Sequence, residues 1–205
     1  MQEGYIQSVF MQEGLKRTQE ERRTETIRAL LAAARKCFAD KGYGGTGTPE
    51  IVAAAGMTRG ALYHHFADKA ALFAAVVEEE HALLAMAINA ASESEDDPGP
   101  VKALIEGGDA FLTAMQDAGR RQILLIDAPA VLGREALDAI NARYGLRTLI
   151  EGVSEAIDAK SIRDLPVLPL AHLLNTMFDR AALATAEELP GYRKSIKALI
   201  RGLKI

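Results

Sequence analysis

Apolar residues recur at intervals of three and four along most of this 205-residue chain, the spacing that places them on one face of an α-helix. One such stripe consists of Ile27, Leu30, Leu31, Ala34, Cys37 and Phe38. Hydrophobic residues make up 49% of the chain but aromatic residues only 5%, so Ala and Leu, which favour helices over strands, supply most of the apolar content. We therefore predict an all-α protein of about nine helices.

The N-terminal third divides at residues that typically start and stop helices. We expect a flexible extension over residues 1–21 and a first helix from about Arg22, which ends where Lys41 and Gly42 supply a C-terminal stop. A second, short helix follows a turn, with Pro49 in its first turn and Thr48 as its N-cap.

Two more caps follow. Gly56 interrupts the second helix, Thr58 caps a third helix that runs to about Phe66, and Asp68 caps a long fourth helix. Further on, the apolar run at 123–126 has no partner strand, so we assign it to a buried helix broken at Pro129.

Charge is distributed unevenly along the chain, whose net charge is −4. Residues 1–70 contain 10 Lys and Arg against 8 Asp and Glu, a net charge of +2, which leaves −6 for residues 71–205. A mildly basic head on an acidic body is compatible with nucleic-acid contact at one end.

The segment at 47–66 reads as a helix-turn-helix, a motif whose second helix enters the major groove of DNA. Small residues at the start of that helix, Gly60 and Ala61, allow its backbone to approach the duplex, and donors surround them. These donors are Thr58, Arg59, Tyr63, His64 and Lys69.

Residues 54–69, Ala-Ala-Gly-Met-Thr-Arg-Gly-Ala-Leu-Tyr-His-His-Phe-Ala-Asp-Lys, closely resemble the signature of the TetR family of transcriptional regulators. The resemblance covers about residues 24–73 and extends to Phe38, Gly42, Tyr43 and Thr46. The chain departs from the family pattern at Gly47, which takes the place of the usual Ser or Thr cap, and at Pro49. We expect Thr48 to take over that cap.

The resemblance implies a DNA-binding domain at 22–70, a ligand-sensing and dimerisation domain at 71–205, and a role for each residue of the motif. Thr48, Thr58, Tyr63 and Lys69 would hold phosphates, which fixes the register on DNA. Arg59, Gly60, Ala61 and His64 would face base edges, and Arg59 is able to make a bidentate contact with guanine.

Other interpretations of these residues stay open. Tyr63 is alternatively a packed ring with its hydroxyl in solvent, and Arg22 and Arg23 are as well explained by a solvated helix start as by a groove contact. His64 and His65 are adjacent and therefore point about 100° apart on a helix, which argues against a shared metal. We expect no metal site and no cofactor, and a structural or capping role for His65.

Residues 75–205 contain neither a nucleophile elbow nor a phosphate-binding glycine loop, so we predict that the chain is not an enzyme. The resemblance implies instead an effector pocket and a dimer interface built by the last two helices, although core packing would explain the same apolar residues. The pocket candidates are His81, Phe111, Met115, Ile123, Asp127 and Phe178. The interface candidates are Leu170, Leu173, Leu174, Met177, Ala181, Ile196, Leu199 and Ile200. Asp127, if buried, needs a partner, which Arg134, Arg147 or a cationic effector would supply.

The expected function is that of a homodimeric repressor that binds double-stranded operator DNA and is released by an unknown small-molecule effector. The alternatives are a helix-turn-helix activator, a regulator that needs no effector, and an enzyme that uses the C-terminal cavity. A single cysteine, Cys37, excludes an internal disulfide and agrees with a reducing compartment. Because no apolar run reaches the length of a membrane span and the N-terminus is too polar for a signal peptide, we expect a cytoplasmic protein without a membrane partner.

Overall fold

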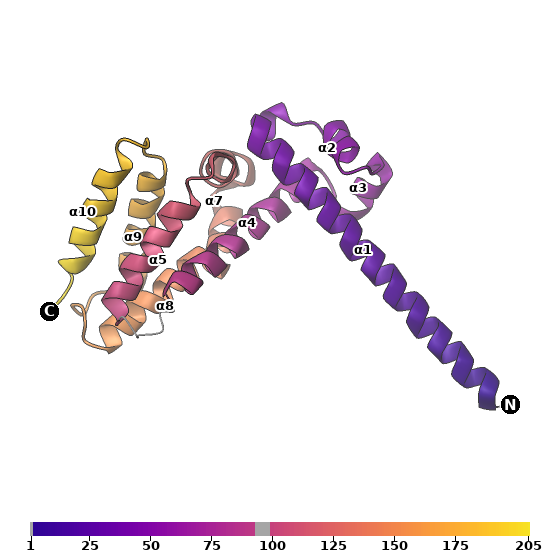
Figure 1. The fold of residues 1–205 in the computed structure, drawn as a ribbon, viewed down its shortest axis with the longest axis horizontal. Helices are drawn as coiled ribbons and strands as arrows, with labels where there is room; N and C mark the ends of the chain where they lie inside the picture. The colour runs from indigo at the N-terminus through magenta and orange to yellow at the C-terminus, as the bar shows by residue number, and fades with distance from the viewer. Residues whose placement is uncertain (1, 93–98) are drawn as a thin grey trace. The chain divides into compact units, whose positions relative to one another are not determined.

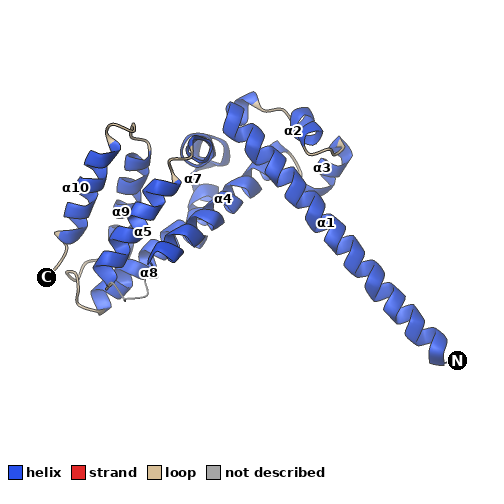
Figure 2. Ribbon diagram, viewed as in Figure 1, coloured by secondary structure: helices blue, strands red, loops and turns tan. Residues whose placement is uncertain are grey.

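The structure, a computed structural model, describes residues 2–92 and 99–205 of the chain, with side chains from residue 19 onward except that of residue 92. All regular elements in these ranges are helical, which confirms the all-α prediction (Figure 2). The elements are α1 (Gln2–Gly45), α2 (Thr48–Ala54), α3 (Arg59–His65), α4 (Lys69–Ser92), α5 (Pro100–Ala114), α6 (Ala118–Arg121), the π-helical turn η1 (Gln122–Asp127), α7 (Ala128–Arg143), α8 (Gly145–Asp158), α9 (Val167–Ala182) and α10 (Leu189–Arg201).

The chain forms two compact units that divide within α4, the first ending at Phe73 and the second beginning at Ala74. In the first unit, α1, α2 and α3 pack together around a core of fully buried side chains. These are Leu30, Ala34, Phe38, Ile51, Leu62, Leu72 and Phe73. The rings of Phe38 and Phe73 meet edge to face, with centroids 5.0 Å apart. The apolar stripe predicted for the first helix is therefore the core-facing side of α1.

The predicted start of the first helix near Arg22 is wrong, because α1 begins at Gln2 (Figure 1). Residues 2–21 contain no Pro and several Gln, Glu, Met and Leu residues, which have good helix propensity, so the helix extends through them. The predicted stop is confirmed, because the helical backbone of α1 is interrupted at Gly42, where φ is 69° and ψ is 170°. Residues 43–45 of α1 follow this interruption. The flexibility of residues 1–21 stays a prediction.

The second unit is a bundle in which α8 packs against α5, α7 and α9, while α10 packs against α5 and α9 (Figure 1). Its close packing is visible at Gly108 on α5. A Cβ atom at that position would overlap the ring of Phe178 on α9, so the absence of a side chain there lets the aromatic ring lie against the α5 backbone.

The apolar run at 123–126 is helical as predicted, but the predicted break at Pro129 is wrong. The run lies in η1, where the backbone N–H of Ala128 donates to the carbonyl of Ile123, five residues back, and the helix then continues through Pro129 as α7. A proline is tolerated there because the wider π turn shifts the hydrogen-bond register just before it. The helical backbone instead breaks at Gly133, where φ is 74°.

Candidate functional site

The turn between α2 and α3 has the geometry of a helix-turn-helix. Gly56 takes φ +64°, a conformation that a residue with a Cβ adopts only at a penalty, and it ends α2. Thr58 then caps α3, its Oγ1 accepting a hydrogen bond from the Ala61 N–H at 3.1 Å, as predicted. Asp68 likewise caps α4 through the N–H of Ala71 at 2.7 Å.

The prediction that Thr48 caps α2 is wrong. The N-cap is Gly47, which makes no side-chain hydrogen bond, and Thr48 is the first residue of the helix. Because Pro49 lacks an N–H, one of the donors that a side-chain cap satisfies is absent, and the helix starts without one.

One edge of α3 is exposed, as the predicted DNA contact requires. Four of the predicted residues, Thr58, Arg59, Gly60 and His64, are exposed, and Ala61 is half-buried. Leu62, on the opposite face, is completely buried in the core of the first unit. The helix is thereby held by its inner face while its N-terminal turn stays open to a partner.

Tyr63 joins this edge to α2. Its side chain is 44% exposed, and its hydroxyl oxygen lies 3.4 Å from Oγ1 of Thr48. Hydrogen bonds from Thr48 and from Arg59 lower the pKa of the Tyr63 hydroxyl. The hydroxyl is therefore at the surface, and both the phosphate contact and the packed ring with its hydroxyl in solvent stay open.

Lys69 has a structural role that sequence reasoning did not anticipate. Its Nζ donates to the carbonyls of Tyr43 at 2.8 Å and Thr46 at 3.0 Å, and it lies 3.8 Å from the centroid of the Tyr43 ring. An ammonium group has three donors, so one N–H is left for a phosphate. Lys69 thus ties the end of α1 to the loop that precedes α2, and its contact with a phosphate stays a prediction.

Thr46 completes this loop and was not among the predicted functional residues. It is 2% exposed, and its hydroxyl lies 3.0 Å from the carbonyl of Cys37 and 2.8 Å from that of Gly42. His65, for which a structural role was predicted, lies with its ring 5.0 Å from that of His64 in an edge-on arrangement, and burial is the main cause that lowers the pKa of His65.

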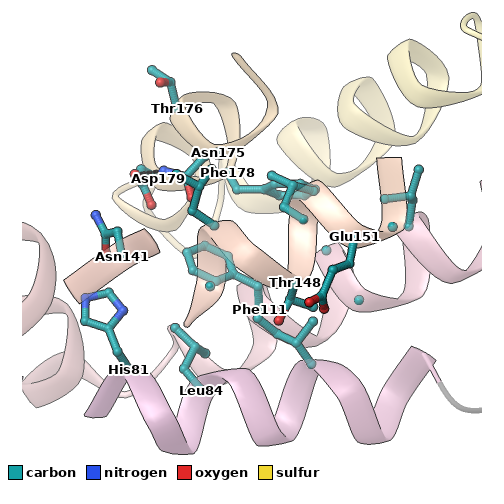
Figure 3. A pocket seen from close by; sticks show the side chains of 18 of the residues that line it. His81, Leu84, Phe111, Asn141, Thr148, Glu151, Asn175, Thr176, Phe178 and Asp179 are labelled. Atoms are coloured by element: carbon teal, nitrogen blue, oxygen red, sulfur yellow. Dashed lines mark hydrogen bonds between the residues drawn. The ribbon is translucent and has the colours of Figure 1, made fainter. Parts of the chain in front are cut away.

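The second unit contains a cavity of about 550 Å³ lined by side chains of α4, α5, η1, α7, α8 and α9 (Figure 3). Three of the predicted pocket residues, His81, Phe111 and Phe178, line it. Met115, Ile123 and Asp127 do not, and their assignment to this cavity is wrong. The first two are fully buried core residues.

Asp127 lies instead at the end of η1, where it accepts a hydrogen bond from Nε2 of Gln122 at 3.1 Å. Asp127 is half-buried, and this hydrogen bond comes from a residue five positions earlier in the same helical segment. Of its proposed partners, Arg147 forms an ion pair with Glu151 at 3.5 Å.

Two polar residues give the cavity its chemical character. The Nε2 atom of His81 is buried and has no hydrogen-bond partner, and burial lowers the pKa of His81 to about 4. Across the bundle on α9, burial raises the pKa of Asp179 to about 6, although Nδ2 of Asn175 donates to Oδ2 of Asp179 at 2.9 Å. In the view of Figure 3, His81, Asn141 and Asp179 gather at one end.

Sequence reasoning missed Asn175 and Asp179. A signal was present, because the two residues interrupt an apolar helix at i and i+4 spacing and so share one face of it. Their position facing a cavity follows from how α9 packs against α5 and α8, and helical periodicity alone does not show this.

The predicted interface residues divide into two groups. Leu174, Ala181, Ile196 and Ile200 are buried within the single chain and belong to its core, with exposed fractions of 6% or less. Leu173 on α9 and Leu199 on α10 are 69% and 60% exposed, and Leu170 and Met177 are half-buried. Only the second group leaves apolar surface for a partner.

Both units of the chain match known protein families. Residues 30–76 match the family described as bacterial regulatory proteins, tetR family, and residues 101–203 match a tetracyclin repressor-like C-terminal domain. A TetR-family transcriptional regulator from Pectobacterium atrosepticum has a similar crystal structure, with 31% identity, a TM-score of 0.76 and coverage of 90% of this chain and 97% of that one.

Two curated relatives are similar in sequence. The Tn10 TetC protein of Escherichia coli is 25% identical over 189 residues, which are 91% of this chain and 94% of that protein. The transcriptional repressor AcnR of Corynebacterium glutamicum is 39% identical over 66 residues, which are 32% of this chain and 35% of AcnR. This match therefore spans about a third of AcnR's length.

None of the described helices is both long and apolar enough to cross a membrane. The family matches cover the helix-turn-helix and the helical bundle separately, and the similarity to the Pectobacterium regulator extends over both. With an exposed α3, a capped helix-turn-helix and a bundle that encloses a cavity, the chain belongs to the TetR family of DNA-binding bacterial regulators.

Proposed function

We propose that this protein is a sequence-specific transcriptional repressor that binds operator DNA as a homodimer and leaves it when a small molecule occupies the cavity of the second unit. The observation that carries the DNA-binding part is the exposed N-terminal turn of α3, with Arg59, Gly60 and His64 on the open side and Leu62 anchored in the core. An α-helix held in this manner fits the major groove, where its first residues reach base edges.

The contacts to DNA divide by chemistry. Arg59, Gly60, Ala61 and His64 face base edges, and Arg59 is the residue able to read a guanine with two hydrogen bonds. Thr48, Thr58, Tyr63 and Lys69 hold phosphates. The neighbouring hydroxyls of Thr48 and Tyr63 support this assignment, because one O–H joins the two groups and the other is left to donate to a phosphate at the same point of the surface.

The dimer interface uses the outward side of α9 and α10. Leu173 and Leu199, the strongly exposed members of the predicted set, contribute its apolar contacts, together with Leu168 on α9, which is 57% exposed. The buried residues Leu174, Ala181, Ile196 and Ile200 support this face from behind and do not belong to the contact itself. A two-fold dimer gives each subunit one half-site on the DNA.

The effector acts by a shift between two dimer geometries. A ligand in the cavity changes DNA affinity only to the extent that it binds one geometry more tightly than the other. The cavity is suited to such a role because its lining comes from α4, which continues from the first unit, and from α9, which carries the proposed interface.

A gel-shift experiment tests this function. The protein is mixed with duplexes from the DNA upstream of its own gene, and Arg59→Ala is compared with Tyr63→Ala and with the control Arg134→Ala, which removes an exposed arginine on α7. We expect both α3 variants to weaken binding, Arg59→Ala with a relaxed base preference and Tyr63→Ala equally on all sequences, and no effect of Arg134→Ala.

Equal losses on all sequences for both α3 variants would contradict the assignment of bases and phosphates. An activator differs from a repressor in a promoter-fusion assay, where deletion of the gene would then lower the output of the operator-bearing promoter and not raise it. Full operator affinity in the presence of every compound that binds the cavity would identify a regulator that needs no effector.

A further inference from the structure

His81 lines the cavity and contributes no positive charge to it. Its Nε2 atom is inaccessible to solvent and has no hydrogen-bond partner, and a buried polar atom in this state is energetically unfavourable. Burial lowers the pKa of His81 to about 4, so the imidazole is uncharged near neutral pH. A neutral imidazole provides no counter-charge for an anionic ligand in the cavity.

Asp179 presents an under-compensated negative charge in the same cavity. Its carboxylate accepts one hydrogen bond, from Asn175, although two carboxylate oxygens offer about four acceptor positions. No lysine, arginine or histidine of the described residues forms a salt bridge with it. Because burial raises the pKa of Asp179 only to about 6, the group is mostly ionised near neutral pH despite its surroundings.

The rest of the lining adds negative charge and apolar surface. Glu151 and Glu155 also line the cavity. Arg180 is a cationic residue of the lining, and its guanidinium lies 5.2 Å from the ring centroid of Tyr192. The remaining lining is largely apolar. Its larger members include Leu84, Leu104, Phe111, Leu146, Leu149 and Phe178.

We infer that the effector is a lipophilic amine, a molecule with an apolar body and one protonated nitrogen. The N–H groups of the nitrogen donate to the Asp179 carboxylate, while the apolar body lies against Phe111 and Phe178. This inference rests on the proposed function only in calling the ligand an effector, since the binding chemistry belongs to the cavity itself.

Charge selects among alternative ligands. An anionic ligand would be repelled by Asp179 and would find no protonated imidazole to pair with. A neutral alcohol would leave the Asp179 charge without a counter-ion. A cationic donor supplies this counter-ion, and charged hydrogen bonds of this kind are about twice as strong as neutral ones.

A matched ligand series tests the inference with the full-length protein. Phenylbutylamine, phenylbutanol and phenylbutanoic acid share one apolar body and differ in the head group, and their binding is measured by titration calorimetry near neutral pH. We expect the amine to bind at least about tenfold more tightly than the alcohol and the acid. A tighter acid or alcohol, or no binding by the amine, would overturn the inference.

Substitutions in the cavity test which side chains contribute to ligand binding. Asp179→Asn keeps the shape of the side chain and removes its charge. We therefore expect it to lower the affinity for the amine by about tenfold or more and to leave the affinity for the alcohol nearly unchanged. The control Asp158→Asn changes an exposed carboxylate outside the lining and should change neither ligand. Unchanged amine affinity in Asp179→Asn would contradict the inference.

A second readout separates this inference from the proposed function. The same ligands are added to the complex of the protein with operator DNA. Calorimetric binding of the amine without loss of the complex would uphold the ligand class and contradict release by an effector. Release of the DNA by the acid or the alcohol alone would support release by an effector and contradict the ligand class.

Discussion

The hydroxyl oxygens of Thr48 and Tyr63 lie 3.4 Å apart, which brings the first residue of α2 against the last turn of α3 at the surface of the first unit. Arg59 also forms a hydrogen bond with the Tyr63 hydroxyl. This one hydroxyl therefore connects a proposed phosphate-binding residue with the proposed base-reading residue.

Replacing Tyr63 by Phe should lower the affinity for DNA by about threefold to tenfold on every sequence, because one neutral hydrogen bond to a phosphate is lost. Unfolding stability should change by less than about 0.5 kcal/mol, since the hydroxyl is exposed. Fluorescence anisotropy with several duplexes and a thermal melt measure the two effects. A loss confined to one base sequence would assign Tyr63 to base reading.

Replacing Lys69 by Met should destabilise the first unit by about 1–3 kcal/mol, because the ammonium group donates to two backbone carbonyls and lies over the Tyr43 ring. The measurement is urea unfolding of the full chain. Lys36→Met, which changes an exposed lysine on α1, is the control and should have a small effect. Equal stability of the two variants would show that the Lys69 contacts contribute little.

Replacing Leu173 by Glu should convert the dimer to monomers with unchanged helix content, since Leu173 is 69% exposed within a single chain. A charged group at the centre of an apolar contact loses its hydration without a partner. Light scattering after size exclusion gives the mass, and circular dichroism the helix content. Ile126→Glu, at an apolar residue of η1 that is 52% exposed, is the matched control and should stay dimeric.

Replacing Asp179 by Asn should stabilise the ligand-free protein near neutral pH. Burial raises the pKa of Asp179 from 3.8 to about 6, so the folded state holds its proton more tightly than the unfolded state. Stability from this group is therefore fully present below about pH 3.8 and is lost as the pH rises through about 6. Asn at position 179 does not titrate in this pH range, so the free energy of unfolding of Asp179→Asn should exceed that of the unsubstituted protein by about 1–3 kcal/mol above about pH 6.

The stability difference between the two proteins, measured by urea unfolding at a series of pH values, isolates this contribution. His81 acts in the opposite direction, because its pKa is lowered and its stability contribution is lost as the pH falls from 6.5 toward about 4. It is present in both proteins, so it cancels in the difference. A difference that stays constant across the window would contradict the raised pKa of Asp179.

Local signals in the sequence were sufficient for the helix-turn-helix. The caps at Thr58 and Asp68 and the stop at Gly42 depend on residues within a few positions of each other, so their chemistry is visible in the chain itself. The Thr48 cap failed by a single residue, since the helix begins at Thr48 with Gly47 as its N-cap, and helix ends are the least constrained part of the pattern.

Periodicity also identified which residues are apolar and helical in the second unit, but it did not distinguish core, cavity and outer surface. Leu173 and Leu174 are neighbours in one apolar helix, and only the packing of α9 against α5 and α8 leaves one exposed and the other buried. The same packing turns Asp179 toward a cavity, while Met115 and Ile123 became core. A helix has several faces, and the sequence determines which of them is apolar, whereas contacts between distant segments decide what each face meets.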